Sequence, residues 1–185
     1  MNTAEARESA GPAGDTLKLT PSESVTIMRA EPGALEVEAL YGPGGEAPPK
    51  HLHPAQDERF EVLAGTLRVR LDGADRGLSP GESIEIPRGA VHQMWNPGTE
   101  PARVTWLTMP AGRTEQWFRA VDRLHRSGRV GRNGMPGPLA FAALLTEFDD
   151  VFRLVAGPEP LVRGALKALA PLGRARGYLP GTPDR

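Results

Sequence analysis

Short segments in which apolar and polar residues alternate fill the first part of the chain. Apolar residues stand at every second position in 35–41, 60–64 and 67–71, which predicts strands with one buried face. Turn residues separate such segments, namely Gly65, Asp72-Gly73, Ser79-Pro80-Gly81, Pro87-Arg88-Gly89 and Asn96-Pro97-Gly98. Many short strands with regular turn signals predict an all-β sandwich or barrel.

The pattern changes to a helical period after residue 110. One helix is predicted to start at Thr114, with that residue as its cap, and to carry an apolar stripe as far as residue 124. A flexible connector leads to a longer helix with its stripe over 141–152, and a third short helix spans about 160–169, stopped by Pro171. Three amphipathic helices need an apolar surface to cover, which is either the outer face of the barrel or a second subunit.

These patterns divide the chain into three parts. Residues 1–20 are predicted to be a disordered segment, because the start of the chain is rich in Ala, Gly, Glu and Ser. A β-barrel is predicted over 21–112 and a helical C-terminal extension over 113–185.

Composition narrows the class of protein. Hydrophobic residues make up 39% of the 185 residues, enough for a sizeable core, and the formal net charge is −1. Basic residues are in excess only after residue 112, and they are scattered, which favours a solvated or intersubunit face over a nucleic-acid site. The absence of cysteine excludes disulfides and thiolate metal ligands. The polar amino terminus does not resemble a secretory signal and no apolar run could span a bilayer, so a cytoplasmic protein is predicted.

Three histidines and a glutamate stand out as candidate metal ligands. His51 and His53 are two apart on a strand and can aim their imidazoles at one point. A turn can return Glu58 to the same place, and His92 must arrive from another strand. Imidazoles and a carboxylate suit a divalent transition metal, and on an octahedral ion two positions remain for water, substrate or dioxygen. The pattern therefore predicts an open metal shell, which could be catalytic.

The segments around these ligands resemble the two motifs of the cupin superfamily. The first, G-x5-H-x-H-x4-E-x6-G, is filled by Gly45, His51, His53, Glu58 and Gly65. The second, G-x5-P-x-G-x2-H-x3-N, is filled by Gly81, Pro87, Gly89, His92 and Asn96. The resemblance covers residues 25–110. It implies a mainly β protein, a jelly-roll barrel (double-stranded β-helix) followed here by about three α-helices, and a homodimer, since cupins are commonly dimers.

Function is less closely defined than the site. The residues predicted to share the inward face and line a pocket are Phe60, Val62, Met94 and Trp106, which favours a hydrophobic or aromatic small-molecule ligand. The resemblance implies a metal-dependent enzyme of dioxygenase, isomerase or cyclase type, with Fe, Mn, Ni, Zn, Co or Cu as cofactor. Two alternatives stay open: a non-catalytic module that binds or senses a small ligand, and a structural protein stabilised by the metal. No convincing second general base is found near the motifs.

Overall fold

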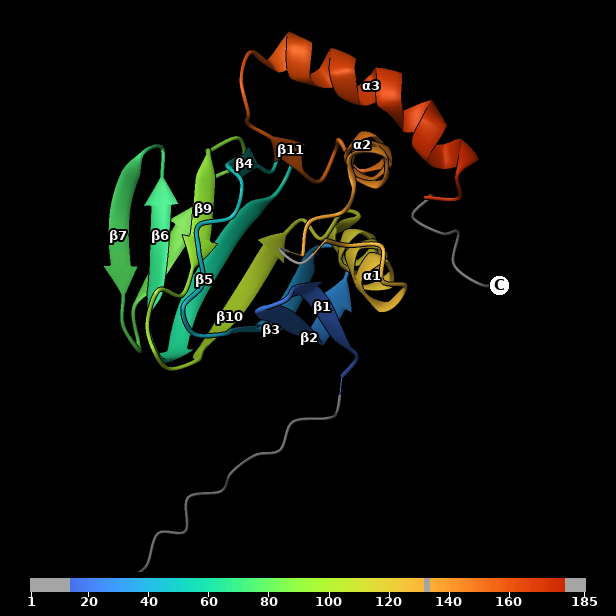
Figure 1. The fold of residues 1–185 in the computed structure, drawn as a ribbon. Coiled ribbons are helices and arrows are strands. Elements are labelled where there is room, and N and C mark those ends of the chain that lie inside the picture. The colour runs from blue at the N-terminus through green and yellow to red at the C-terminus, as the bar shows by residue number, and fades with distance from the viewer. Residues whose placement is uncertain (1–13, 132–133, 179–185) are drawn as a thin grey trace, which may run out of the picture.

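Two antiparallel β-sheets form the body of the protein (Figure 1). The computed structural model describes residues 14–131 and 134–178. In spatial order, the larger sheet consists of β1 (Thr16–Thr20), β2 (Glu23–Glu31), β3 (Ala34–Tyr41), β10 (Ala102–Met109), β5 (Asp57–Ala64) and β8 (Ser83–Ile86). The smaller sheet consists of β11 (Arg153–Leu154), β4 (His51–Leu52), β9 (His92–Trp95), β6 (Leu67–Leu71) and β7 (Ala74–Leu78). The predicted jelly-roll barrel is confirmed.

The alternation in the sequence places the core between the sheets. On β3, Leu35 and Val37 are 1% exposed, whereas Glu36 between them is only partly buried. Phe60 on β5 and Val69 on β6 are completely buried and approach from the two sheets. Burying an aliphatic or aromatic side chain of this size stabilises the fold by about 1.5–3 kcal/mol, so the period-two pattern fixes which face of each strand turns inward.

The chain enters the barrel earlier than predicted. The prediction of a disordered segment over residues 1–20 is wrong for residues 16–20, which form β1; residues 1–13 lie outside the described residues. Leu17 pairs with Val25 on β2 and is 4% exposed, and the backbone N–H of Lys18 donates to Asp122 Oδ1 at 2.9 Å. The polar composition of the preceding residues obscured this short strand.

Three helices lie after β10 in the described part of the chain, as predicted, but their bounds differ. They are α1 (Thr114–Arg126), α2 (Pro138–Glu147) and α3 (Glu159–Ala175). Thr114 is not the cap of α1, because Arg113 holds that position and makes no capping side-chain bond. α2 ends before the predicted stripe does, so Phe152 lies beyond it. Pro171 lies inside α3 instead of stopping it, since α3 packs along α2 and this contact maintains the helix.

Two of the three helices contribute side chains to the core that the barrel begins. α1 packs on β1, and α3 packs on α2 (Figure 1). Trp117 and Phe118 of α1 and Leu144 of α2 belong to the same buried cluster as the barrel residues. The helices were predicted to cover the outer face of the barrel or a second subunit. Phe118 of α1 instead packs on Trp106 in the buried core, with ring centroids 5.0 Å apart. The division of the chain at residue 112 and the homodimer stay predictions.

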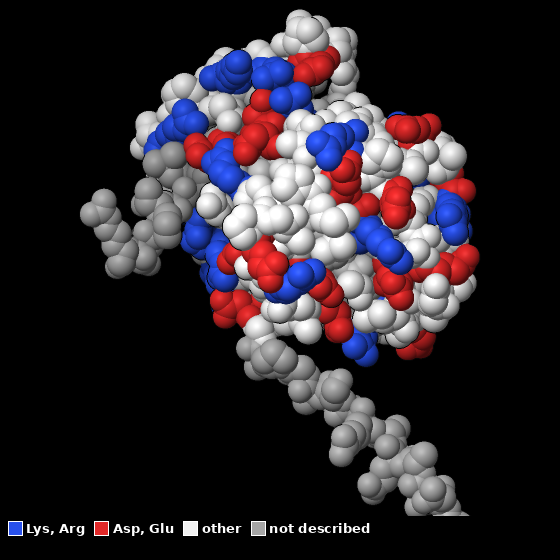
Figure 2. All heavy atoms as spheres, turned by 180° about the vertical axis from the view of Figure 1, so that it is seen from behind, with Lys and Arg blue, Asp and Glu red and all other residues white. Residues whose placement is uncertain are grey.

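Charged side chains of both signs are mixed on the surface. Figure 2 shows Lys and Arg side chains interspersed with Asp and Glu over the face opposite to that in Figure 1. Ion pairs such as Arg103–Glu38, at 3.0 Å, join side chains of opposite charge. That face lacks the continuous basic surface with which proteins bind polyanions. None of the helices in the described part of the chain has an apolar stretch that could cross a membrane.

Candidate metal centre and adjoining cavity

Three histidine rings meet at one end of the smaller sheet. His51 opens β4 and pairs directly with His92, which opens β9. Their ring centroids are 4.4 Å apart, and His53 lies 5.3 Å from each of them. One nitrogen from each ring falls within 4.8 Å of the others. The structure thus brings together the three histidines that the sequence predicted as ligands.

Backbone carbonyls orient all three imidazoles. The Nδ1 atoms lie 3.0 Å from Pro49 O for His51, 2.7 Å from Val151 O for His53 and 3.1 Å from Ala90 O for His92. A carbonyl can only accept, so each Nδ1 carries the proton and donates it. Each Nε2 is then left with a free lone pair, which is the state that a metal ligand needs.

Glu58 completes the group from the larger sheet. It lies on β5 and is 2% exposed. Its Oε2 atom is 3.4 Å from Nε2 of His53 and 3.3 Å from Nε2 of His92, and its Oε1 accepts a hydrogen bond from Trp106 Nε1 at 3.0 Å. Burial acts to raise the pKa of Glu58, but the two histidines and Trp106 outweigh it and lower that pKa, so the carboxylate is ionised. His51, His53, Glu58 and His92 are called the His/Glu cluster below.

The His/Glu cluster has the donor atoms that suit a divalent cation. Burial, followed by the charges of His92 and His53, holds the pKa of His51 well below its ordinary value, and burial also lowers the pKa of His53. Glu58 Oε2 and His92 Nε2 are buried and have no hydrogen-bond partner among the described residues. Buried lone pairs that converge without a proton between them are costly unless a cation joins them. These four residues therefore fit a divalent transition metal.

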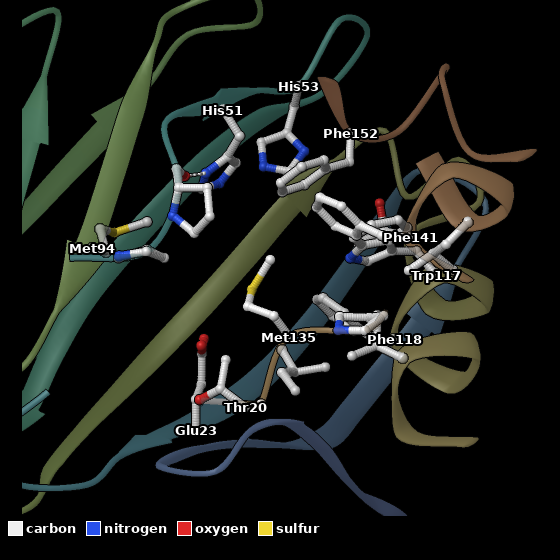
Figure 3. Close-up of a pocket in the computed structure, with 18 of the residues that line it drawn as sticks. Thr20, Glu23, His51, His53, Met94, Trp117, Phe118, Met135, Phe141 and Phe152 are labelled. Atoms are coloured by element: carbon white, nitrogen blue, oxygen red, sulfur yellow. Dashed lines mark hydrogen bonds between the residues drawn. The ribbon is translucent and has the colours of Figure 1, made fainter. Parts of the chain in front are cut away.

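A cavity of about 170 Å³ adjoins the histidines (Figure 3). The barrel supplies one wall, and α1, residues 134–136 and α2 supply the other. Its surface is mainly apolar and aromatic, with Met94, Trp106, Trp117, Phe118, Phe141 and Phe152 among the lining residues. The three histidines also line it, but Glu58 does not, so the His/Glu cluster opens toward the cavity on its histidine side.

The segment after α2 covers the cluster, which was not predicted. β11 pairs with β4, and Leu154 lies opposite His51. The ring of Phe152 stacks on His51, with centroids 4.5 Å apart and planes at 13°, and on its other side stacks on Trp117 at 4.8 Å and 12°. The helical stripe had placed Phe152 on the long second helix. A strand of two residues has no periodicity that could have indicated otherwise.

Two of the four predicted pocket residues line this cavity and two do not. Met94 and Trp106 face it. The prediction for Phe60 and Val62 is wrong for this cavity, because both are packed in the barrel core at 0% and 1% exposure. The Phe60 ring packs against that of Trp106, with centroids 5.1 Å apart, and Trp106 is the residue that reaches the cavity.

A carboxyl group outside the motifs also lines the cavity. Glu23 on β2 lies directly opposite Tyr41 on β3, and the two side chains are hydrogen-bonded. Burial raises the pKa of Glu23 to about 7, although the bond from Tyr41 acts to lower it. The sequence held a signal for this residue, since Glu23 is two positions before the buried Val25 and shares its face.

Comparison with known proteins supports the architecture. Residues 37–108, which include the whole His/Glu cluster, match the family of the cupin domain. A segment of 66 residues is 35% identical to the tetracenomycin polyketide synthase protein TcmJ of Streptomyces glaucescens, covering 36% of this chain and 44% of that protein. A segment of 88 residues is 42% identical to mannose-1-phosphate guanylyltransferase of Escherichia coli, covering 48% of this chain and 17% of that protein.

A solved structure shows the same fold. An RmlC-like cupin from Shewanella frigidimarina superposes with a TM-score of 0.52 at 18% identity, covering 60% of this chain and 96% of the other. The chain spans less than half the length of the two curated relatives described above. The family match, over residues 37–108, lies within the barrel strands.

Proposed function

Because residues 37–108 are a cupin domain, we propose that the His/Glu cluster binds one divalent transition metal and that the chain is a metal-dependent enzyme acting on a small, largely apolar organic molecule. The observation that supports this most is the position of the cluster. Its free Nε2 atoms face each other and Glu58 Oε2, and the histidine side opens onto an aromatic cavity.

The residues around the cluster support a fixed and accessible centre. Carbonyls at Nδ1 hold the histidine rings, and Trp106 Nε1–H holds the carboxylate of Glu58. When bound, the metal would supply Lewis-acid activation of a carbonyl or enolate, or a binding position for dioxygen. The apolar walls exclude water and position a ring or alkyl group beside the histidines.

The names of the relatives bear on the class of reaction. The names of matched curated proteins include a polyketide synthase protein and an oxidoreductase. The second name supports the dioxygenase type, and the isomerase and cyclase types stay alternatives for the same metal centre. Any of Fe, Mn, Ni, Zn, Co or Cu is compatible with three imidazoles and a carboxylate. The predicted cytoplasmic location and homodimer stay predictions.

Metal content of matched histidine variants tests the site. We expect protein purified without an affinity tag to contain about one equivalent of a transition metal by elemental analysis. In His92→Ala the metal content should be lower by about tenfold or more. The control is His125→Ala, because His125 bonds the carbonyl of Leu19 at 2.9 Å and is not part of the cluster. Equal metal content in the two variants would exclude the proposed ligand set.

Removing the metal distinguishes an enzyme from a structural role. The barrel has its own apolar core, so chelation of the metal should leave the circular dichroism spectrum and the cooperative unfolding transition in place. Loss of the fold on chelation would instead assign the metal a structural role.

A further inference from the structure

The cavity has polar groups at two ends. Figure 3 shows His51 and His53 at one end and Glu23 with Thr20 at the other, with Met94, Met135 and aromatic rings between them. The carboxyl group of Glu23 points into the cavity. A ligand that reached both ends would meet the histidines with one group and Glu23 with another.

Glu23 keeps free capacity to accept hydrogen bonds. A carboxylate offers about four lone-pair positions, and the hydrogen bond from Tyr41 uses one of those of Glu23. Burial, together with the charge of Glu23, raises the pKa of Tyr41, so the phenol keeps its proton and remains a donor. The pair is therefore held in place across β2 and β3, while the remaining acceptor positions of Glu23 are available to a donor in the cavity.

A second group in the cavity also lacks a partner. Thr114 lines the cavity and is 1% exposed, and its Oγ1 has no hydrogen-bond partner in the described part of the chain. A buried hydroxyl without a partner is unfavourable, and a polar group of a bound molecule would satisfy it. This observation is independent of Glu23 and also indicates a ligand that carries polar groups.

We propose that Glu23, held by Tyr41, is a recognition point that binds a hydrogen-bond donor, a hydroxyl or amino group, of an aromatic ligand whose ring fills the cavity. A volume of about 170 Å³ is close to that of the roughly 150 Å³ cavity that admits benzene, so a single ring with small substituents fits. The inference rests on the proposed function only in taking this cavity as the substrate site. It names a second contact for the substrate, opposite the His/Glu cluster.

Binding of matched probes to metal-free protein tests the proposal. The probes are 4-methylphenol, 4-methylbenzylamine and 4-methylanisole, of which the last has the ring but no donor. Titration calorimetry at pH 8 should show at least one of the two donors binding about tenfold or more tightly than the ether, since hydrogen bonds to charged groups are strong. Comparing the phenol with the amine identifies the kind of donor that Glu23 selects.

Variants at position 23 test whether Glu23 causes the preference for a donor over the ether. Glu23→Met should abolish the ratio between donor and ether while leaving the affinity for the ether unchanged, and Glu23→Gln, which keeps a neutral acceptor, should reduce the ratio. Glu31→Gln, at an exposed position of the same strand, should keep it. An undiminished ratio in Glu23→Met, or no binding of any probe at about 5 mM, would overturn the proposal. Metal content of Glu23→Met should equal that of the wild type, so a failure of the metal site is recognised separately.

Discussion

The buried carboxyl of Glu23 should make the stability of the protein depend on pH. Its pKa is raised from 4.5 to about 7 in the folded state, chiefly by burial. The folded state therefore binds more protons than the unfolded chain between these two values, and the free energy of unfolding falls as pH rises through this window. The contribution is fully present below pH 4.5 and is lost above about pH 7.

The substitution Glu23→Gln removes this term while retaining the shape of the side chain. A shift of one pKa unit corresponds to about 1.4 kcal/mol, so the wild type should lose about 2 to 3 kcal/mol relative to the variant between pH 5 and pH 8. This is an upper value, because Glu23 keeps part of its surface exposed. In a chain of this length it corresponds to roughly 5–10 °C in melting temperature.

Urea unfolding curves at several pH values between 5 and 8 provide the measurement. The difference between variant and wild type isolates Glu23, because histidines that titrate in the same range contribute equally to both proteins. Glu31→Gln removes an exposed carboxylate from the same strand and should run parallel to the wild type. If the Glu23→Gln and wild-type curves are also parallel, within about 0.5 kcal/mol, Glu23 does not take up a proton on folding and the reasoning is refuted.

Two further substitutions test the turn at Gly65 and the Phe152 ring that covers the cluster. Gly65 has φ +75°, and a Cβ there would meet the carbonyl of Pro101, whereas Gly73 has φ +90° and open space around it. In urea unfolding, Gly65→Ala should therefore lower the free energy of unfolding by about 2 kcal/mol more than Gly73→Ala does. Equal losses would refute the clash with Pro101. Phe152→Ala should lower the free energy of unfolding by about 2 kcal/mol, because the stacking on His51 and Trp117 is lost. The metal content measured by elemental analysis should not change. An unaltered free energy of unfolding would show that the ring does not cover the cluster.

The candidate ligands could be predicted from the sequence because two short motifs with fixed spacing carry all four of them. His51 lies on β4 and His53 directly follows that strand, and the pairing of β4 with β9 places His92 opposite His51. The helix that starts at Thr114 could be predicted as well, since its apolar stripe spans several turns. A helical stripe of this kind depends on neighbours a few residues away.

The wall of the cavity could not be predicted because its contacts are long-range. Val151 accepts the hydrogen bond of His53 across 98 positions of the chain. Phe152 fitted a helical stripe equally well, and only pairing of β11 with β4 removes it from the helix. The position of Glu23 opposite Tyr41 depends on the register of β2 and β3. The hydrophobic pattern alone does not identify Glu23 as a residue that could contact a ligand.

The stacking of Phe152 on His51 shows that metal ligation and access to the histidines come from different parts of the chain. The donor atoms of the His/Glu cluster come from barrel strands, whereas the ring over them comes from a segment that follows the second helix. Exchange of that segment between related proteins would change which molecules reach the histidines without changing a single donor atom. Access to the site and metal ligation are thus carried by different parts of the chain, which meet at the hydrogen bond from His53 Nδ1 to the carbonyl of Val151.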